Sequence, residues 1–329
     1  MASLLITGAA GFIGAHTAQA LAAAGHQVIG LDNFNSYYDP ALKRARVVQL
    51  LAPAGVACES MDLVDLDGLR GLIREHRVDT VLNLAAQAGV RYSVEQPMAY
   101  VHSNLQGFGA VLEACRLEGV QHLLYASSSS VYGRRADAPF RETDRIDRPA
   151  SFYAATKAAN EALAYATAGI HHLPCTGLRF FTVYGPWGRP DMAYWTFAER
   201  IKRGEPIKLF DRGELLRDFT YVDDVVNALL RLVQKGAPSK DDNGVPARIF
   251  NLGHRHPVKV VEFVATLEAA LGLKAQVEYA PMQPGDVPVT CADPSRLVAA
   301  IGDLQHTPLD VGLQRFADWF GPWQAGQYS

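Results

Sequence analysis

The sequence predicts an α/β protein in which a parallel sheet is covered on both faces by helices, followed by a smaller C-terminal lobe. Three observations lead to this prediction. Short apolar segments alternate with segments of helical periodicity over the first half of the 329 residues. The glycine cluster "TGAAGFIG" separates the first apolar segment from the first helical one. The chain becomes irregular later, beginning with the Gly- and Pro-rich stretch "VYGPWGRPDM".

The expected elements follow one another at short intervals. Strands are expected at "SLLIT", "HQVIGLD", "VACESMDL", "VDTVLNLAA", "QHLLYAS" and "LPCTGLRFF". Early helices are expected at "GFIGAHTAQALAAAG", "DLDGLRGLIREH", "AYVHSNLQGFGAVLEACRLEGV" and "SFYAATKAANEALAYATAG". Later ones are expected at "WTFAERIKRG", "DDVVNALLRLVQKG", "VEFVATLEAALG" and "GLQRFADWF". We therefore expect a nucleotide-binding domain over 1–180 and a second lobe over 181–329, with segments near 220–255 returning to the first domain.

Composition excludes several classes of function. A net charge of -3 gives no reason to expect nucleic acid as a partner, and the apolar runs are too short to cross a bilayer. The start "MASLLITGAAG" lacks the basic segment of a signal peptide. The cysteines are scattered, without a C-x-x-C pair, at Cys58, Cys115, Cys175 and Cys291. We expect no metal site, no disulfide and a cytoplasmic location.

The glycine cluster predicts a dinucleotide site. Gly8, Gly11 and Gly14 stand between a strand and a helix, where glycines allow a tight turn and close approach of the backbone to a pyrophosphate. Asp32 follows the second strand, and its carboxylate can accept hydrogen bonds from the adenosine ribose. Because the same carboxylate would repel a 2′-phosphate, the pattern favours NAD over NADP. Asp62, after the third strand, is a candidate for the adenine amino group or, alternatively, a helix N-cap.

A Tyr-Lys pair supplies a candidate base. Tyr153 and Lys157 are four residues apart, on one face of a predicted helix. A tyrosine is a poor base at its ordinary pKa of about 10, and a neighbouring ammonium group lowers that pKa by stabilising the phenolate. We therefore expect Tyr153 to exchange a proton with the substrate and Lys157 to assist it and to hold the nicotinamide ribose.

These motifs together resemble a known family. "TGAAGFIG", "LDN", "NLAAQAG", "SSSSVYG", "YAATK" and "RDFTYVDD", in this order, resemble the extended short-chain dehydrogenase/reductases that act on nucleotide sugars. The resemblance implies a doubly wound Rossmann domain with tightly bound NAD and a C-terminal lobe for a nucleotide diphosphate sugar. "DNFNSYYDPALKRAR", "NLAAQAGVRYSVEQPMAY" and "PMQPGDVPVT" are most similar to the members acting on UDP-hexuronates.

The resemblance also implies further site residues. Around NAD these are Phe12, Ile13, Asn33, Leu63, Ala85, Ala86, Gln87 and Asn104. Around the uridine diphosphate they are Lys208, Arg217 and Asp286, of which Arg217 offers a guanidinium that grips a diphosphate in a bidentate manner. The alternative for Arg217 and its neighbour Asp218 is an ordinary surface ion pair.

The serine run "SSSS" discriminates between reactions. By the resemblance, Ser128 is the catalytic hydroxyl, and related dehydratases and decarboxylases carry acids at one or both of the next two positions. Here those positions are Ser129 and Ser130, which can donate hydrogen bonds to a uronate carboxylate that an acid would repel. Further candidates for contact with an acidic sugar are Arg91, Thr182 and Arg189.

The implied activity is inversion of carbon 4 of a UDP-linked hexuronate through a transient 4-keto sugar, with NAD retained and the protein a homodimer. Three alternatives remain. The chain can be an epimerase for neutral UDP-hexoses, an oxidoreductase or decarboxylase acting on the UDP-hexuronate, or an NAD-binding regulator without catalytic activity. An intact set of Ser128, Tyr153 and Lys157 argues against the last.

Overall fold

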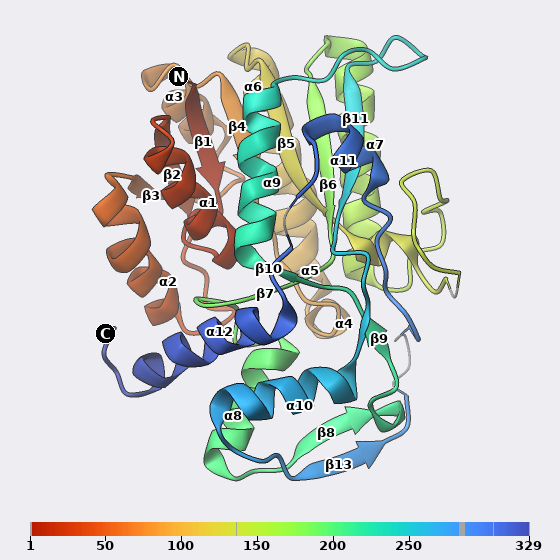
Figure 1. The fold of residues 1–329 in the computed structure, drawn as a ribbon. Helices are drawn as coiled ribbons and strands as arrows, with labels where there is room; N and C mark the ends of the chain where they lie inside the picture. The colour runs from red at the N-terminus through yellow and green to blue at the C-terminus, as the bar shows by residue number, and fades with distance from the viewer. Residues whose placement is uncertain (1, 136, 283–286, 305, 329) are drawn as a thin grey trace. The chain divides into compact units, whose positions relative to one another are not determined.

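The structure is a computed structural model that describes residues 2–135, 137–282, 287–304 and 306–328. It divides into two compact units. The first comprises 1–133, 145–180 and 226–250, and the second comprises 134–144, 181–225 and 251–329. Figure 1 labels the strands and helices of both units.

The first unit is built on a seven-stranded sheet with the order β11-β6-β5-β4-β1-β2-β3. Its strands are β1 (Ser3–Thr7), β2 (Gln27–Asp32), β3 (Ala57–Ser60), β4 (Thr80–Asn83), β5 (His122–Ser128), β6 (Cys175–Phe180) and β11 (Ala247–Leu252). All pairings from β3 across to β6 are parallel. The order reverses at β1, which lies between β2 and β4, so the sheet is doubly wound. The predicted fold class is confirmed.

Helical segments connect these strands. They are α1 (Phe12–Ala23), α2 (Pro40–Arg46), η1 (Val47–Leu51), η2 (Ala52–Ala54), α3 (Leu66–Glu75), α4 (Tyr92–Glu95), α5 (Pro97–Tyr100), η3 (Val101–Gln106), α6 (Gly107–Leu117), η4 (Ser129–Tyr132), α7 (Phe152–His171) and α9 (Val222–Lys235), most of which belongs to this unit. Local chemistry sets several starts. The side chains of Asp39, Asp65 and Ser151 each accept a hydrogen bond from a backbone N–H of the first turn of α2, α3 and α7.

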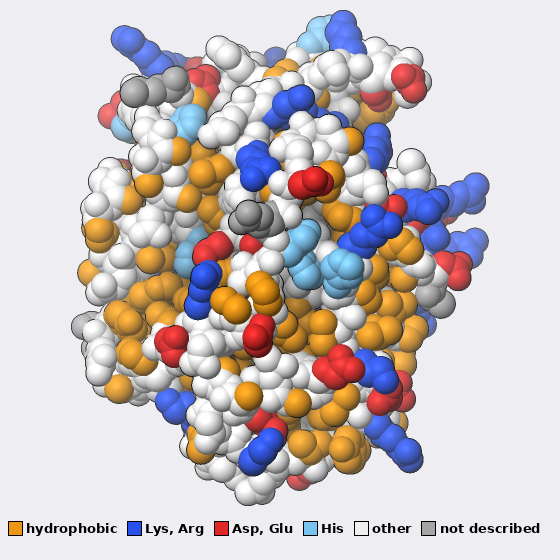
Figure 2. All heavy atoms as spheres, in the orientation of Figure 1, with side chains coloured by type: hydrophobic (Ala, Val, Ile, Leu, Met, Phe, Trp, Pro, Cys, Tyr) orange, Lys and Arg blue, Asp and Glu red, His pale blue; other side chains and the backbone are white. Residues whose placement is uncertain are grey.

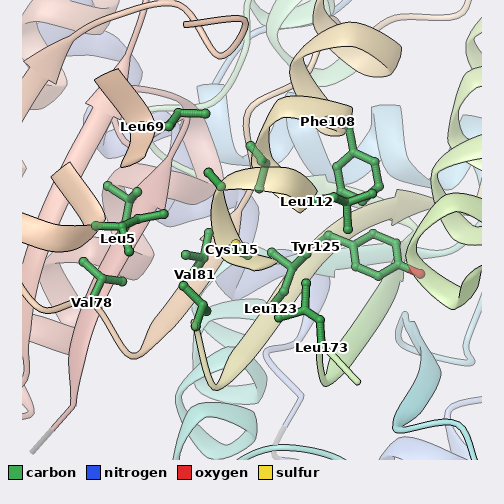
Figure 3. Packing of buried hydrophobic residues seen from close by; sticks show 14 of the residues in the cluster. Leu5, Leu69, Val78, Val81, Phe108, Leu112, Cys115, Leu123, Tyr125 and Leu173 are labelled. Carbon is green, nitrogen blue, oxygen red and sulfur yellow. The ribbon is translucent and has the colours of Figure 1, made fainter. Parts of the chain in front are cut away.

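One hydrophobic core of the first unit lies between a face of the sheet and three helices. Leu5, Val81 and Leu123 project from neighbouring strands toward side chains of α3, α6 and α7 (Figure 3). Leu4 and Ile6 alternate with Leu5 along β1 and are fully buried on the opposite face, where α1 packs. Helices on both faces explain why these strands are continuous apolar runs.

The second unit contains three small two-stranded sheets, β7–β10, β9–β12 and β8–β13. Its elements are β7 (Thr182–Tyr184), α8 (Ala193–Arg203), β8 (Ile207–Phe210), η5 (Asp211–Gly213), β9 (Leu216–Arg217), β10 (Phe219–Tyr221), β12 (Val258–Lys259), α10 (Val260–Leu271), β13 (Val277–Ala280), α11 (Ser295–Ile301) and α12 (Leu309–Gln324). All four tryptophans of the chain, Trp187, Trp195, Trp319 and Trp323, pack in one aromatic cluster of this unit.

Acidic and basic side chains are interspersed over the face drawn in Figure 2, which agrees with the small net charge. Within the described residues, the helices are all too short or too polar to span a bilayer.

Candidate active site

The loops after β1 and β4 meet where the strand order reverses. In an open α/β sheet, ligands bind at the carboxyl ends of the strands at this switch point. The two loops touch so closely that a Cβ atom added to Gly8 would lie 2.8 Å from the backbone nitrogen of Ala85. The predicted cofactor residues Ala85 and Ala86 are therefore placed beside the glycine turn.

The glycine turn has little room for side chains. Gly8 has a φ of +70°, and its carbonyl oxygen accepts a 2.9 Å hydrogen bond from the backbone N–H of Gly11. A Cβ atom on Gly14 would lie 2.0 Å from that same oxygen. Phe12 and Ile13 form the first turn of α1 between these glycines. Only a glycine at position 14 lets this turn close onto the helix N-terminus, the arrangement that binds a pyrophosphate.

Asp32 ends β2 with one carboxylate oxygen available. Its Oδ1 atom accepts hydrogen bonds from the Nζ of Lys43, at 2.8 Å, and from the backbone N–H of Phe34, at 2.9 Å. Its Oδ2 atom has no hydrogen-bond partner within the described residues. It is also not one of the polar side-chain atoms there that are both unpaired and fully buried, so solvent or a ligand can reach it. The carboxylate therefore presents one oxygen that fits a ribose hydroxyl.

Two buried cations on α2 escaped the sequence analysis. Lys43 and Arg46 are 6% and 0% exposed. Arg46 donates to the backbone oxygen of Ala10, at 3.0 Å, and to the hydroxyl of Tyr38, at 2.8 Å. The first of these hydrogen bonds stabilises the glycine loop. The spacing of three residues between Lys43 and Arg46 puts both on one helix face. This spacing does not by itself predict burial, because lysine and arginine are usually exposed.

Asp62 lies in the turn after β3 and is not a helix cap. Its Oδ2 atom accepts a 3.0 Å hydrogen bond from the side chain of Asn33, and His102 lies 3.2 Å from its Oδ1 atom. The N-cap of α3 is Asp65, so the alternative interpretation of Asp62 was wrong. Leu63, next to it, is buried in the core.

Asn104 holds the loop after β4 in place. Its Oδ1 atom accepts the backbone N–H of Gln87, at 2.8 Å, while its Nδ2 atom donates to the backbone oxygen of Gln87 and to the hydroxyl of Thr156, both at 3.0 Å. These contacts join the loop to α7 at the residue before Lys157. Asn104 is thus engaged by protein groups and positions the loop.

The serine run forms the end of β5 and a turn. β5 ends at Ser128, whose Oγ atom accepts hydrogen bonds from the backbone N–H of Ser130, at 3.2 Å, and from its hydroxyl, at 2.9 Å. Ser128, Ser129 and Ser130 are all partly exposed, while Ser127 is buried. The turn therefore presents three consecutive hydroxyls at the carboxyl edge of the sheet.

Tyr153 and Lys157 lie on the first two turns of α7. Tyr153 is partly exposed and makes an edge-on contact with the ring of Tyr100 at 5.9 Å between centroids. Lys157 is buried, and its Nζ atom donates a 2.8 Å hydrogen bond to the backbone oxygen of Ala126 on β5. Burial lowers the pKa of Lys157 to about 8, and the Glu161 carboxylate partly offsets that fall.

The remaining predicted residues belong to both units. Arg91 is exposed at the start of α4 in the first unit. The second unit contains Thr182 at the start of β7, Arg217 on β9 and Lys208 exposed on β8. Asp286 lies outside the described residues.

Two acids in the second unit change how its arginines are interpreted. Asp218 is fully buried and accepts backbone N–H groups of His254, Arg255 and Ala292, so it is a structural anchor and the surface ion pair considered for this position was wrong. Arg189 forms a bidentate pair with Asp191, with distances of 3.0 and 2.6 Å. Sequence analysis missed this partner although it is only two residues away.

Comparisons with known proteins identify the family of the chain. Residues 4–253 match the family described as "NAD dependent epimerase/dehydratase family". The chain is 46% identical over 334 residues to UDP-glucuronate 4-epimerase 4 of Arabidopsis thaliana, covering 98% of this chain and 76% of the relative. It is 42% identical over 329 residues to a probable UDP-glucuronate 4-epimerase of Rhizobium meliloti (strain 1021), covering 96% of each.

A solved structure shows the same fold. The UDP-glucuronic acid 4-epimerase from Bacillus cereus, in complex with UDP-glucuronic acid and NAD, matches with a TM-score of 0.88 at 30% identity, covering 98% of this chain and 99% of that one. The family match, the identities and the shared fold lead to one conclusion: the chain belongs to the NAD dependent epimerase/dehydratase family.

Proposed function

We propose that the protein is a UDP-glucuronate 4-epimerase, which interconverts UDP-glucuronate and UDP-galacturonate. The observation that carries the proposal is the turn of three partly exposed serines, Ser128 to Ser130, at the carboxyl end of β5 in the same unit as Tyr153 and Lys157. Relatives named for this activity support it.

The cofactor fits the first unit. The turn between Gly8 and Gly14 has no room for a Cβ atom beside the oxygen of Gly8, and Asp32 offers one carboxylate oxygen toward a ribose. Asn33, Asp62, Ala85, Ala86 and Gln87 complete the proposed NAD site. NAD supplies reversible storage of the hydride that leaves carbon 4 of the sugar.

Tyr153 is the proposed acid–base residue. It takes the proton of the 4-hydroxyl as the keto sugar forms, and it returns that proton to the 4-hydroxyl of the product. The Lys157 ammonium stabilises the phenolate, and the Ser128 hydroxyl holds the sugar oxygen at hydrogen-bond distance. Since the hydride that leaves carbon 4 returns to the same carbon, and the proton returns to its oxygen, no net redox change occurs. Inversion requires only that the keto sugar present its other face before it is reduced.

The acidic sugar needs donors rather than acids around it. Ser129 can donate a hydrogen bond to the uronate carboxylate, and Ser130 can do so by turning its hydroxyl hydrogen away from Ser128. Thr182, Arg189 and Arg91 are the further proposed donors. The 4-keto sugar is a β-keto acid that can lose carbon dioxide. Holding its carboxylate by several hydroxyls keeps the breaking bond out of the orientation that favours this loss.

The two units are proposed to bind different ligands, as the sequence predicts. The first unit is proposed to bind NAD and to supply the proton-transfer groups, and the second to supply Arg217, Lys208 and Asp286 for the uridine diphosphate. A homodimer in the cytoplasm is also proposed. Support comes from exposed apolar residues on α7, Phe152, Leu163 and Ile170, and from four free cysteines.

Proton NMR of the product formed from UDP-glucuronate, with no NAD added, tests the proposal. Appearance of UDP-galacturonate supports it, and the Tyr153→Phe protein, which should keep its NAD, is the inactive control. A decarboxylated or dehydrated product, turnover that consumes added NAD, or conversion of UDP-glucose with no conversion of UDP-glucuronate would overturn it.

A further inference from the structure

Helix α7 carries a third ionisable residue in line with Tyr153 and Lys157. Glu161 follows Lys157 by four residues, so the three side chains lie on one helix face. Glu161 is 4% exposed, and its carboxylate accepts hydrogen bonds from the Nε and Nη2 atoms of Arg179 on β6, at 2.9 and 2.7 Å. The hydroxyl of Ser127 donates a third hydrogen bond to it, at 2.5 Å. The proposed mechanism uses none of these groups.

Arg179 extends the contact to the serine turn. Its Nη1 atom donates a 2.9 Å hydrogen bond to the hydroxyl of Tyr132, the last residue of η4. Arg179 is 3% exposed, so neither it nor Glu161 is placed to touch a substrate. The pair thus joins α7 and β6 to Ser127 and Tyr132, the residues on either side of Ser128 to Val131.

Two hydrogen bonds to consecutive residues of β5 fix the position of helix α7 along that strand. Lys157 donates to the backbone oxygen of Ala126, and Glu161 accepts the hydroxyl of Ser127. The next residue, Ser128, is the proposed catalytic hydroxyl. A small slide or rotation of α7 along β5 would break both hydrogen bonds at once and would move Tyr153 relative to Ser128.

Stability alone does not account for this pair. Burying an ion pair costs desolvation that its attraction seldom exceeds, and apolar residues of the same volume are often as stabilising. An apolar pair, however, fixes orientation poorly. The planar guanidinium donates hydrogen bonds in fixed directions to two carboxylate oxygens and a phenol oxygen. These bonds fix the relative orientation of the three side chains, which apolar packing alone would not fix.

We infer that Glu161 and Arg179 are positioning residues, which fix the serine turn of Ser128 relative to Tyr153 and Lys157. The inference rests on the proposed function for its kinetic test. Displacing a reacting group by about 1 Å can cost on the order of 100-fold in rate while substrate binding persists, so the expected effect falls on kcat.

Three variants of the NAD-loaded protein test it. Arg179→Lys keeps a cation beside Glu161 but cannot reach Tyr132 at the same time, Tyr132→Phe removes one hydroxyl, and Glu161→Gln removes the charge. Each should lower kcat for UDP-glucuronate by about 10- to 100-fold, with KM within about threefold of the parent and NAD retained.

Glu118→Gln is the matched control. Glu118 also accepts hydrogen bonds from two arginines, Arg70 and Arg74, at 2.8 and 2.7 Å, but it follows α6 and makes no contact with the serine turn. Its loss should lower Tm and leave kcat unchanged. If kcat in Arg179→Lys and Tyr132→Phe stays within about twofold of an active parent, or simply follows Tm in all four variants, the inference is overturned.

A second readout needs no turnover, so it separates this inference from the proposed function. The near-ultraviolet phenolate absorbance that Tyr153→Phe removes reports ionisation of Tyr153 alone. Arg179→Lys should raise the pH at which that absorbance appears, because a displaced Lys157 stabilises the phenolate less. An unchanged pH in folded Arg179→Lys overturns the inference even where the parent fails to convert UDP-glucuronate, a failure that would count against the proposed function alone.

Discussion

The Nζ atom of Lys157 donates a 2.8 Å hydrogen bond to the backbone oxygen of Ala126, two residues before the proposed catalytic serine. The ammonium group is thus buried against a strand, with one carboxylate, Glu161, close enough to influence it. Burial lowers the pKa of Lys157 to about 8, which places its loss of charge in the range where enzymes are assayed.

We expect kcat to fall as pH rises through about 8, since only the protonated form of Lys157 stabilises the Tyr153 phenolate. The measurement is kcat for UDP-glucuronate at saturating substrate, with samples returned to neutral pH to show that the loss is reversible. A constant kcat from pH 7 to pH 10 would show that the charge of Lys157 is not required.

The same group should have the opposite effect on stability. The folded pKa of Lys157, about 8, is below its ordinary value of 10.5, so between these values the unfolded chain binds more protons and stability rises with pH. Below about pH 8 the full cost of burying the ammonium is present. Lys157→Met should therefore raise the free energy of unfolding at pH 7 by roughly 1–3 kcal/mol, a gain that shrinks toward pH 10 in urea titrations. A gain that grows with pH would contradict this sign.

The Asp32–Lys43 pair makes cofactor choice depend on two residues. Asp32→Asn removes the charge that repels a 2′-phosphate and leaves the buried Lys43 ammonium without its partner, 2.8 Å away in the parent. We expect the ratio of NADP to NAD affinity to rise by at least about tenfold, measured by calorimetry on the NAD-free protein. Adding Lys43→Met should reduce that rise, because only the loss of the Asp32 charge then remains. If the double variant shows the same ratio of NADP to NAD affinity as Asp32→Asn alone, Lys43 plays no part.

The Arg189–Asp191 pair predicts a selective effect on acidic substrates. Both side chains are a quarter exposed, and Asp191 neutralises the guanidinium that is proposed to face the uronate. Arg189→Ala should lower kcat/KM for UDP-glucuronate by at least about tenfold more than for UDP-glucose. Asp191→Asn, which frees the guanidinium, should lower KM for UDP-glucuronate. Equal losses with both sugars would show that Arg189 acts on the shared diphosphate or on folding.

How much the sequence could predict depended on the distance between partners. Gly8, Gly14 and the spacing of Tyr153 and Lys157 are local patterns with one physical meaning each, so they were predicted. The pairs Asp32–Lys43 and Glu161–Arg179 join residues 11 and 18 positions apart, and a single sequence carries no signal of such pairing. Glu161 continues the four-residue spacing of Tyr153 and Lys157, so its place on the same helix face could have been predicted from the sequence.

The place of one segment in the second unit could not be predicted from local sequence pattern, for a different reason. The stretch 134–144 belongs to the second unit, although it lies between strands of the first. Asn251 shows why: its Nδ2 atom donates to the backbone oxygen of Phe140, and its backbone N–H donates to Glu142. More than 100 residues separate these partners, so only the folded chain reveals that they belong together.

Replacing a glycine by alanine should have opposite effects on stability in the glycine turn and in the middle of a helix. A Cβ atom on Gly14 would lie 2.0 Å from the oxygen of Gly8, a backbone atom that cannot move without opening the turn. Gly14→Ala should therefore lose bound NAD and destabilise the protein by about 1–3 kcal/mol or more. Gly109, in α6, has nothing within 4 Å of an added Cβ, so Gly109→Ala should keep NAD and gain up to about 1 kcal/mol. Thermal unfolding and the absorbance of protein-bound NAD measure both effects, and NAD retained at parental levels by Gly14→Ala would show that the turn tolerates displacement of Gly8.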